Sequence, residues 1–163
     1  TVSDAEIHSS IHRIASQEGV FAAPEGAATY AAYEKLLANG HLQPEAGTIE
    51  HAYFLQWLWF SEATFSRPVG EIVNHRREFP GENEIPEIVE EMQSRIFKCV
   101  VALDRALEGK SFILGTDFTA ADISLGYTLS IAENRIPEPF PKRVANYWDS
   151  ISSRKGFLVA KET

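Results

Sequence analysis

Apolar side chains recur every three or four positions between residues 86 and 108, and this spacing constrains the fold more than any other feature of the sequence. The series is Ile88, Met92, Ile96, Val100, Leu103 and Leu107. Residues three and four positions apart lie on one face of an α-helix, so the series predicts a long amphipathic helix. Pro86 suits the first turn of such a helix, and Gly109 suits its end.

The same helical spacing extends along most of the chain. It predicts further helices over residues 2–17, 24–39, 48–67, 69–78, 119–134 and 141–153. Pro68 is expected to end or kink the helix before it, because proline lacks the N–H that a helix interior needs. A strand-like pattern is limited to residues 111–114. The predicted fold class is therefore all-α.

The helix predicted over residues 48–67 is apolar nearly all round. Its large apolar residues are Tyr53, Phe54, Leu55, Trp57, Leu58, Trp59, Phe60 and Phe65. Such a helix must be covered on several sides, either by neighbours in the chain or by another subunit. The aromatic members either fill the core or line an apolar cleft.

Composition and charge exclude several classes of protein. The 163 residues suffice for one domain with a sizeable core. Asp and Glu number 23 against 15 Lys and Arg, and the net charge of −8 argues against nucleic-acid binding. Cys99 is the single cysteine, which excludes an internal disulfide and a cysteine-based zinc cluster. Without an apolar run of about 18 residues or a leader peptide, we expect a cytoplasmic protein with no membrane segment.

The strongest local motif lies at residues 115–123. Thr119 and Asp122 have the spacing of an N-terminal capping box, in which Asp122 bonds back to the Thr119 N–H. Phe118 and Ile123 have the spacing of a hydrophobic staple. Taken alone, the motif indicates a structural helix start without chemistry.

This motif, LGTDFTAADISL at residues 114–125, resembles the capping-box helix of the C-terminal domain of cytosolic glutathione S-transferases. Upstream, GTIEHAYFLQWLWFSEATF at residues 47–65 is similar to the first long helix of that domain. Downstream, PKRVANYWDSISSRKGF at residues 141–157 resembles its closing helix. That helix usually ends Arg-Pro-Ala-Phe in the family, so Lys155 and Gly156 are a departure.

The resemblance implies a helical bundle that supplies an apolar wall for a co-substrate and much of a homodimer interface. By position it nominates Phe60, Thr64 and Arg67 as the lining of an apolar substrate cleft. In the family, a preceding thioredoxin-like domain binds glutathione and activates its thiol. Residues 1–46 do not resemble that domain, so we expect no cofactor, and glutathione only if a separate domain supplies its site.

Residues 1–46 resemble something else, the near-C-terminal segment of threonine synthase-like enzymes that use pyridoxal phosphate. The resemblance rests on VSDAEI, EGVFAAPEGAAT and KLLANGHLQPE. The Schiff-base lysine and the glycine-rich phosphate loop of those enzymes have no counterpart, so we expect no pyridoxal phosphate chemistry. The predicted organisation is an N-terminal helical pair over residues 1–46 and a glutathione S-transferase C-terminal-like domain over residues 47–163. An artificial chimera, a natural recombination and a mis-joined reading frame remain open as its origin.

Other candidate sites have simpler interpretations. His8 and His12 are four residues apart, but no third metal ligand is evident, so we expect solvent-facing side chains and no metal. Cys99 fits a buried position better than a nucleophile. The run from His75 to Arg77 is interpreted as a solvated patch rather than an anion contact.

Three functions are consistent with these resemblances. The first is a transferase-like module that is non-catalytic alone and binds an apolar small molecule, a protein partner or a dimer mate. The second is a functional glutathione S-transferase whose thiol-activating domain is supplied elsewhere. The third is a recombination product with no selected function.

Overall fold

The computed structural model describes residues 2–38 and 42–161, except for the side chains of residues 18, 25 and 36–38. The chain divides into two compact units, Thr1–Gln43 and Pro44–Thr163. The sequence prediction placed this boundary after residue 46, in the same connection between helices.

The first unit is a pair of packed helices, α1 (Asp4–Glu18) and α2 (Pro24–Ala38). At the start of α1 the Ser3 N–H donates to Glu6 Oε2 at 2.7 Å, and the Glu6 N–H donates to Ser3 Oγ at 3.4 Å. These two bonds satisfy backbone donors that a helix start leaves unpaired. Gly19 ends the helix with φ of 67°, a left-handed conformation that glycine adopts without steric cost.

Small residues form the contact between α1 and α2. Ser10, Ala27 and Ala31 are buried, and ion pairs join Arg13 to Glu34 and Lys35 to Glu6. The larger apolar residues of this unit are half-buried, namely Ile7, Ile11, Ile14, Tyr30 and Tyr33. The spacing of the sequence places Leu37 on one face with Tyr30 and Tyr33, and its side chain lies outside the described residues.

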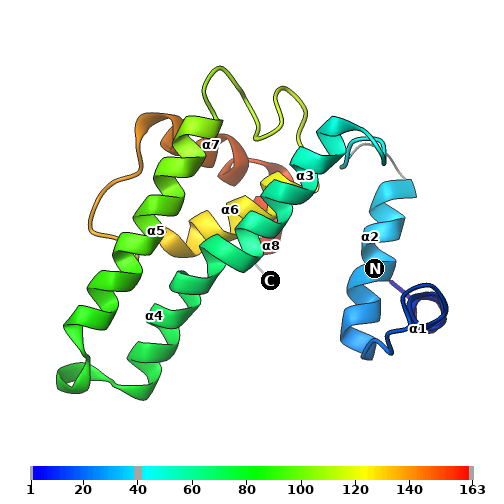
Figure 1. Cartoon of the computed structure of the whole chain (residues 1–163), viewed down its shortest axis with the longest axis horizontal. Coiled ribbons are helices and arrows are strands. Elements are labelled where there is room, and N and C mark those ends of the chain that lie inside the picture. Colours follow the sequence, from blue (N-terminus) through cyan, green and yellow to red (C-terminus); the bar gives the residue numbers. More distant parts are fainter. Residues whose placement is uncertain (1, 39–41, 162–163) are drawn as a thin grey trace. The chain divides into compact units, whose positions relative to one another are not determined.

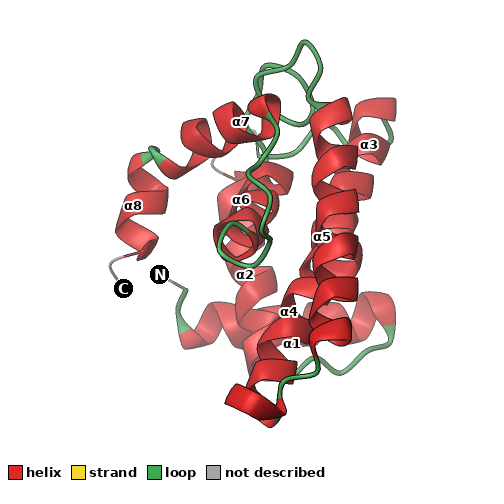
Figure 2. Cartoon of the chain, turned by 90° about the vertical axis from the view of Figure 1, so that its left-hand side faces the viewer, coloured by secondary structure: helices red, strands yellow, loops and turns green. Residues whose placement is uncertain are grey.

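The second unit consists of helices joined by short connections. They are α3 (Ile49–Trp59), the π-helix η1 (Phe60–Phe65), α4 (Ser66–Glu78), the 3₁₀-helix η2 (Gly81–Asn83), α5 (Pro86–Ala106), α6 (Ala120–Ala132), α7 (Lys142–Ser152) and α8 (Lys155–Lys161). Figure 2 shows helices and loops alone across the described residues, which confirms the predicted all-α class. Within that part of the chain, no helix is long and apolar enough to cross a membrane.

The prediction that Pro68 ends or kinks the preceding helix is wrong in its first alternative, because the chain continues as a helix through Glu78. The π-helix η1 precedes the proline, and the Ser66 N–H bonds to Ser61 O across its wide turn. Pro68 is thereby the third residue of α4. Proline is tolerated near the start of a helix, and this position coincides with the change from η1 to α4.

Two other elements differ from the sequence-based expectation. Residues 111–114 form no strand but a tight turn, in which Phe112 and Gly115 exchange backbone hydrogen bonds of 2.8 and 2.9 Å. Helix α8 was not predicted, because a segment of seven residues is too short to show a helical period.

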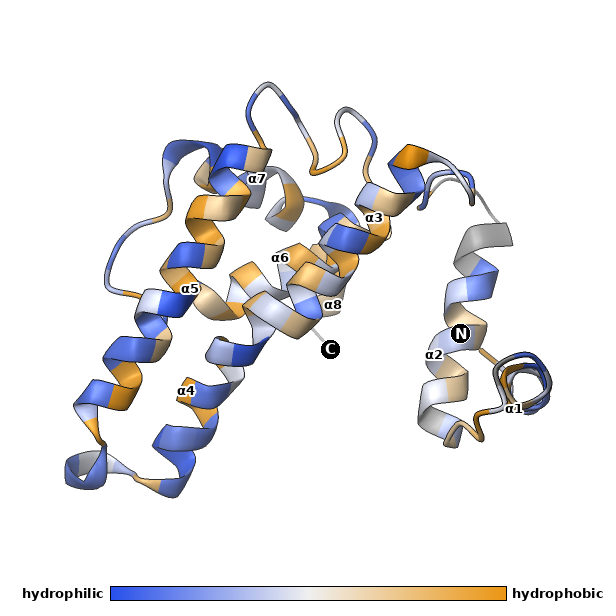
Figure 3. Cartoon of the chain, in the orientation of Figure 1, coloured by the Kyte–Doolittle hydropathy of each residue, from blue (hydrophilic) through white to orange (hydrophobic). Residues whose placement is uncertain are grey.

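Helix α6 is the centre of the second unit. It contacts α3, η1, α4 and α7, while α4 and α5 pack against each other as an antiparallel pair (Figure 1). Figure 3 shows the difference in hydropathy, with α6 mostly orange and α4 mostly blue. A helix surrounded by others needs apolar residues on most of its faces, whereas a peripheral helix needs only a stripe.

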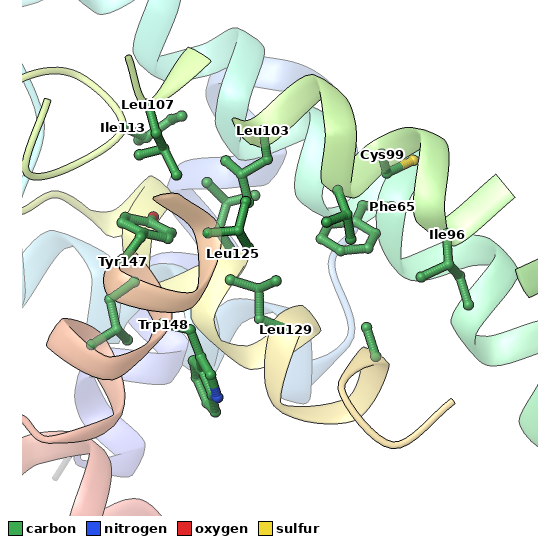
Figure 4. Close-up of a cluster of buried hydrophobic side chains, with 14 of the residues drawn as sticks. Phe65, Ile96, Cys99, Leu103, Leu107, Ile113, Leu125, Leu129, Tyr147 and Trp148 are labelled. Atoms are coloured by element: carbon green, nitrogen blue, oxygen red, sulfur yellow. The ribbon is translucent and has the colours of Figure 1, made fainter. Parts of the chain in front are cut away.

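The core fills the space between α5, α6 and α7. Leu103 of α5 and Leu125 and Leu129 of α6 are fully buried, with Tyr147 and Trp148 of α7 beside them (Figure 4). At Gly126 the helices α6 and α7 approach closely, since a Cβ there would lie 2.7 Å from Ile151 Cγ2. The series predicted to be buried along residues 86–108 is partly so: Ile96, Val100, Leu103 and Leu107 are buried, whereas Ile88 near the start of α5 is 40 % exposed.

Candidate functional site

A groove of about 730 Å³ opens between the first half of α6, the end of α7 and α8. Its walls are largely apolar. The lining residues are Phe118, Ile123, Tyr127, Ile151, Arg154, Lys155, Gly156, Phe157 and Ala160. Small-molecule sites in proteins typically enclose roughly 300–1,000 Å³ and are mostly apolar, so the groove has the size and lining of one.

One wall of the groove is a face of α6. Phe118 directly precedes the helix cap, and Ile123 and Tyr127 are one helical turn apart, so the three present a continuous apolar surface. Ile123 is 47 % exposed and Tyr127 is 63 % exposed. In an otherwise central helix, this is a face that the rest of the unit leaves open.

The opposite wall is held in place by an aromatic contact. The Phe157 ring of α8 meets the Trp148 ring of α7 edge-on, with 5.2 Å between centroids and an interplanar angle of 86°. Edge-to-face pairs of this kind are favourable because the positive ring edge meets a negative ring face. The contact anchors the short helix α8 to α7.

Two cations stand beside this apolar surface. The Arg154 guanidinium carbon lies 3.6 Å from the centroid of the Phe118 ring, a cation–π contact that spans the groove from the α7–α8 connection to the start of α6. Lys155 follows directly, and both side chains are exposed. Across residues 2–38 and 42–161, neither one forms an ion pair with a carboxylate.

The start of α6 is fixed by the buried carboxylate of Asp122. Its Oδ2 accepts from the Thr119 N–H at 2.8 Å and from the Thr119 hydroxyl at 2.9 Å. Its Oδ1 accepts from the Ile113 N–H at 2.9 Å and from the Tyr147 hydroxyl at 2.8 Å. Asp122 therefore joins the turn at residue 113, the cap of α6 and the body of α7. Through the cap it sets the position of Phe118 in the groove.

The buried hydroxyl and thiol groups are poor nucleophiles or bases in this setting. Burial and the adjacent Asp122 raise the pKa of Tyr147 far above its ordinary value. Burial likewise raises the pKa of the Cys99 thiol, and no charged partner opposes the shift. Ser61 and Thr128 are buried with their hydroxyls 3.1 Å apart.

None of the three residues nominated for a substrate cleft lines the groove between α6 and α8. Phe60 is half-buried and packs edge-on against Trp57, with 5.1 Å between centroids. Thr64 is exposed. Arg67 pairs with Glu71 at 3.7 Å and lines a separate hollow of about 190 Å³ beside Met92 and Arg95.

The histidines are split between surface and core. His8 and His12 are exposed, and no cluster of three metal-ligating side chains occurs in the described part of the chain. His75 corrects the interpretation of residues 75–77 as a solvated patch: it is 8 % exposed and its Nε2 accepts from the Ile85 N–H at 2.9 Å. Arg76 and Arg77 are exposed and pair with Glu84 and Glu78.

The groove itself was not predicted. Of the residues that line it, Phe118 and Ile123 were singled out, but as a staple that closes on itself. The departure at Lys155 and Gly156 was the available signal, because both residues line the groove and an ideal Cβ at Gly156 would meet nothing within 4 Å.

Comparison with known proteins agrees with this architecture. Residues 86–150 match the family model described as the glutathione S-transferase C-terminal domain. This stretch runs from the start of α5 into α7 and includes Thr119 and Asp122. Searched against curated proteins, the sequence finds no match.

Solved glutathione transferases share the fold. A glutathione S-transferase from Actinobacillus pleuropneumoniae is 20 % identical with a TM-score of 0.65, over 83 % of this chain and 60 % of that one. A glutathione transferase from Phanerochaete chrysosporium in complex with oxidized glutathione is 20 % identical with a TM-score of 0.71, over 86 % and 65 %. The chain thus spans less than two thirds of the length of these structures. The second unit has an all-α fold similar to that of the glutathione S-transferase C-terminal domain.

Proposed function

We propose that this chain is a glutathione S-transferase-like C-terminal module that binds apolar small molecules in the groove between α6 and α8. The observation that carries the proposal is the groove itself, whose floor and walls come from Ile123, Tyr127, Ile151 and Phe157. Removing apolar ligand surface from water supplies roughly 25 cal/mol per Å², which suffices for binding in an open groove of this size.

On its own, the module binds without catalysing conjugation. Activating a glutathione thiol requires a hydroxyl or thiol that can hold the sulfur as a thiolate. The Tyr147 hydroxyl donates to Asp122, and the Cys99 thiol is buried with a raised pKa. Neither of these two groups lines the groove, whose own hydroxyl, that of Tyr127, is largely exposed to solvent.

The module also associates with a partner, with a second copy of the chain as the expected one. The support is an apolar surface on α3, where Ile49, Tyr53 and Trp59 are 72 %, 55 % and 66 % exposed. Large apolar side chains exposed on one helix are typical of protein interfaces. Size-exclusion chromatography with light scattering measures the mass in solution, and a monomer at all concentrations would contradict this part.

A second function is favoured by the structural neighbours, which are whole glutathione transferases, one of them in complex with oxidized glutathione. In this alternative the chain is the electrophile-binding part of a working glutathione S-transferase, and a thiol-activating domain comes from elsewhere. Conjugation of glutathione to a generic aromatic electrophile separates the two functions. Turnover by the purified chain would contradict the non-catalytic proposal.

Binding is tested with phenylnaphthylamine, a neutral probe that fluoresces in apolar surroundings. We expect saturable binding that the variant Gly156→Leu abolishes, because the added side chain points into open space at the groove. Gly70→Leu is the matched control, since Gly70 lies on α4 and its Cβ would also meet nothing within 4 Å. Equal binding by both variants would place the probe outside the groove.

A further inference from the structure

His75 is a buried histidine on which neither the groove nor the proposed function depends. It lies near the end of α4 and is 8 % exposed, and its Nε2 accepts a hydrogen bond of 2.9 Å from the Ile85 N–H. Ile85 directly precedes α5, which packs antiparallel to α4 (Figure 1). This one side chain therefore joins the end of α4 to the start of α5 across residues 79–84.

Further contacts of His75 hold the same connection. Its backbone carbonyl accepts from the Phe79 N–H at 2.8 Å, and its ring lies against the Phe79 ring with 5.0 Å between centroids. The residues of the connection are otherwise largely exposed. Exposed segments with few buried contacts open locally at a small cost in free energy, so the loss of one hydrogen bond is a large change for this connection.

The bond to Ile85 requires an Nε2 that carries no proton. A backbone N–H can only donate, whereas an imidazole that has gained a second proton donates at both nitrogens and accepts at neither. Protonation of His75 therefore sets two donors against each other and leaves the Ile85 N–H without its acceptor. Histidine is the side chain that ordinarily gains a proton between about pH 8 and about pH 5.

The charged groups around His75 do not compensate for a positive charge on its ring. Its neighbours Arg76 and Arg77 are themselves cations, paired with Glu84 and Glu78. The elements beside α4 carry further exposed charges, namely Glu62 of η1, Glu82 of η2, Glu87, Glu90, Glu91, Arg95 and Lys98 of α5, and Glu133 at the end of α6. Across residues 2–38 and 42–161, no carboxylate forms an ion pair with His75.

We propose that His75 is a pH-sensitive switch: the neutral imidazole keeps the connection between α4 and α5 closed, and the protonated imidazole releases it. The open connection allows the extra proton and the closed one does not. The closed form is thus stabilised at neutral pH and loses that stabilisation as the pH falls. The groove is built from other helices, so this inference is independent of the proposed function.

Amide hydrogen exchange of the full chain, measured by NMR, tests the switch. Exchange of the Ile85 N–H between about pH 7.5 and about pH 5 is expressed as a protection factor, which corrects for the pH dependence of exchange in an open chain. The amide of fully buried Leu129 in α6 reports on global unfolding.

Two histidine variants make the comparison specific. In His75→Gln the amide oxygen can replace Nε2 as the acceptor, and it does not titrate. His12→Gln makes the same substitution at an exposed position of α1, in the other unit of the chain.

We expect the protection of the Ile85 N–H to fall about tenfold or more between about pH 7 and about pH 5, because a proton taken up by one form alone shifts the equilibrium by up to tenfold per pH unit. Protection of Leu129 should stay constant. His75→Gln should retain the protection of Ile85 at neutral pH and lose its pH dependence. His12→Gln should behave as the natural sequence does.

The other outcomes overturn the switch. These are a pH-independent protection of Ile85 in the natural sequence, an equal pH dependence in His75→Gln, or a simultaneous loss of protection at Ile85 and Leu129. If His75→Gln leaves Ile85 unprotected at every pH, the ring-nitrogen shifts of His75 in the natural sequence decide. Titration of the ring outside the pH range in which Ile85 loses protection would then overturn the inference.

Discussion

Asp122 is completely buried, and four donors from three parts of the chain converge on its two oxygens. A buried carboxylate is costly unless its hydrogen-bonding capacity is filled, and here it is filled. These donors have Asp122 as their acceptor. Removing its carboxylate would therefore leave buried N–H and O–H groups without a hydrogen bond.

We expect Asp122→Asn to reduce the free energy of unfolding by about 2–4 kcal/mol, because the amide NH₂ would face donors in place of an acceptor. Asp117→Asn, an exposed substitution in the same loop, should change it by about 0.5 kcal/mol or less. Urea unfolding followed by circular dichroism measures both. Similar values for the two variants would contradict the bonding scheme.

The raised pKa of Tyr147 leads us to expect a lower free energy of unfolding at alkaline pH. Its pKa lies well above its ordinary value of 10.0 because of burial and the neighbouring Asp122. A group whose folded-state pKa is raised stabilises the fold below the unfolded pKa. That contribution falls as the pH rises above about 10, where the unfolded tyrosine ionises and the folded one does not.

The comparison variant is Tyr147→Phe, which has no ionisable hydroxyl. Thermal unfolding between about pH 8 and about pH 11 should show a steeper fall for the natural sequence than for the variant. Identical slopes would show that Tyr147 ionises equally in both states.

At the scale of helices, two glycines provide a test with opposite signs. Gly126 lies where α6 meets α7, and a Cβ there would be 2.7 Å from Ile151 Cγ2, whereas a Cβ at Gly70 in α4 meets nothing within 4 Å. Gly126→Ala should lower the free energy of unfolding by about 1–3 kcal/mol through overpacking. Gly70→Ala should raise it by up to about 1 kcal/mol through helix propensity.

Adding Ile151→Leu isolates the contact, because leucine carries no methyl group on Cβ. The penalty of Gly126→Ala should shrink in that background, and chemical denaturation of the four proteins completes the double-mutant cycle. An unchanged penalty would mean that the cost arises elsewhere in α6.

The helices differ in how far their sequence predicts them. The starts of α1 and α6 were predictable because Ser3 with Glu6, and Thr119 with Asp122, act over one helical turn. The π-helix η1 was not, because its residues obey the same apolar spacing as an α-helix and only the wider turn distinguishes them. The expected end of the helix at Pro68 failed for the same reason.

The groove could not be predicted from the sequence, for a different reason. Its walls come from residues between 118 and 160, which meet only when α8 turns back beside α6. Phe60 was nominated for a cleft by its position in the family resemblance, and in the structure its ring packs against Trp57 and Phe65. Conversely, exposed Tyr127 shows no local pattern that separates a groove residue from a core residue.

At the scale of the whole molecule, the two units have separate cores. The second unit has a continuous buried cluster of its own that reaches from Phe54 to Ile151. The first unit keeps apolar residues half-buried, among them Ile11 and Tyr33, after α1 and α2 have packed. The remaining apolar area leads us to expect that the first unit covers the second or completes a dimer.

Deleting residues 1–43 tests this expectation. We expect the remaining helical domain to stay folded, with a lower thermal midpoint or a changed oligomeric state, because apolar surface would lose its cover. Thermal unfolding and light scattering measure the two quantities. If neither changes, the helical pair has no structural role for the domain that follows it.

The π-helix Phe60–Phe65 has a consequence in genetic terms. Inserting one codon adds one residue to a helix and rotates every later side chain by about 100° around the helix axis. A wider turn, such as a π-helix, can absorb the added residue and prevent this rotation. Here the wider turn lies between Phe54 of α3 and Val69 and Ile72 of α4, all of which face the core. The π-helix η1 thus keeps the buried faces of α3 and α4 turned toward the same core. Loss of a single codon within it would restore uniform α-helical winding and leave Val69 and Ile72 facing the core.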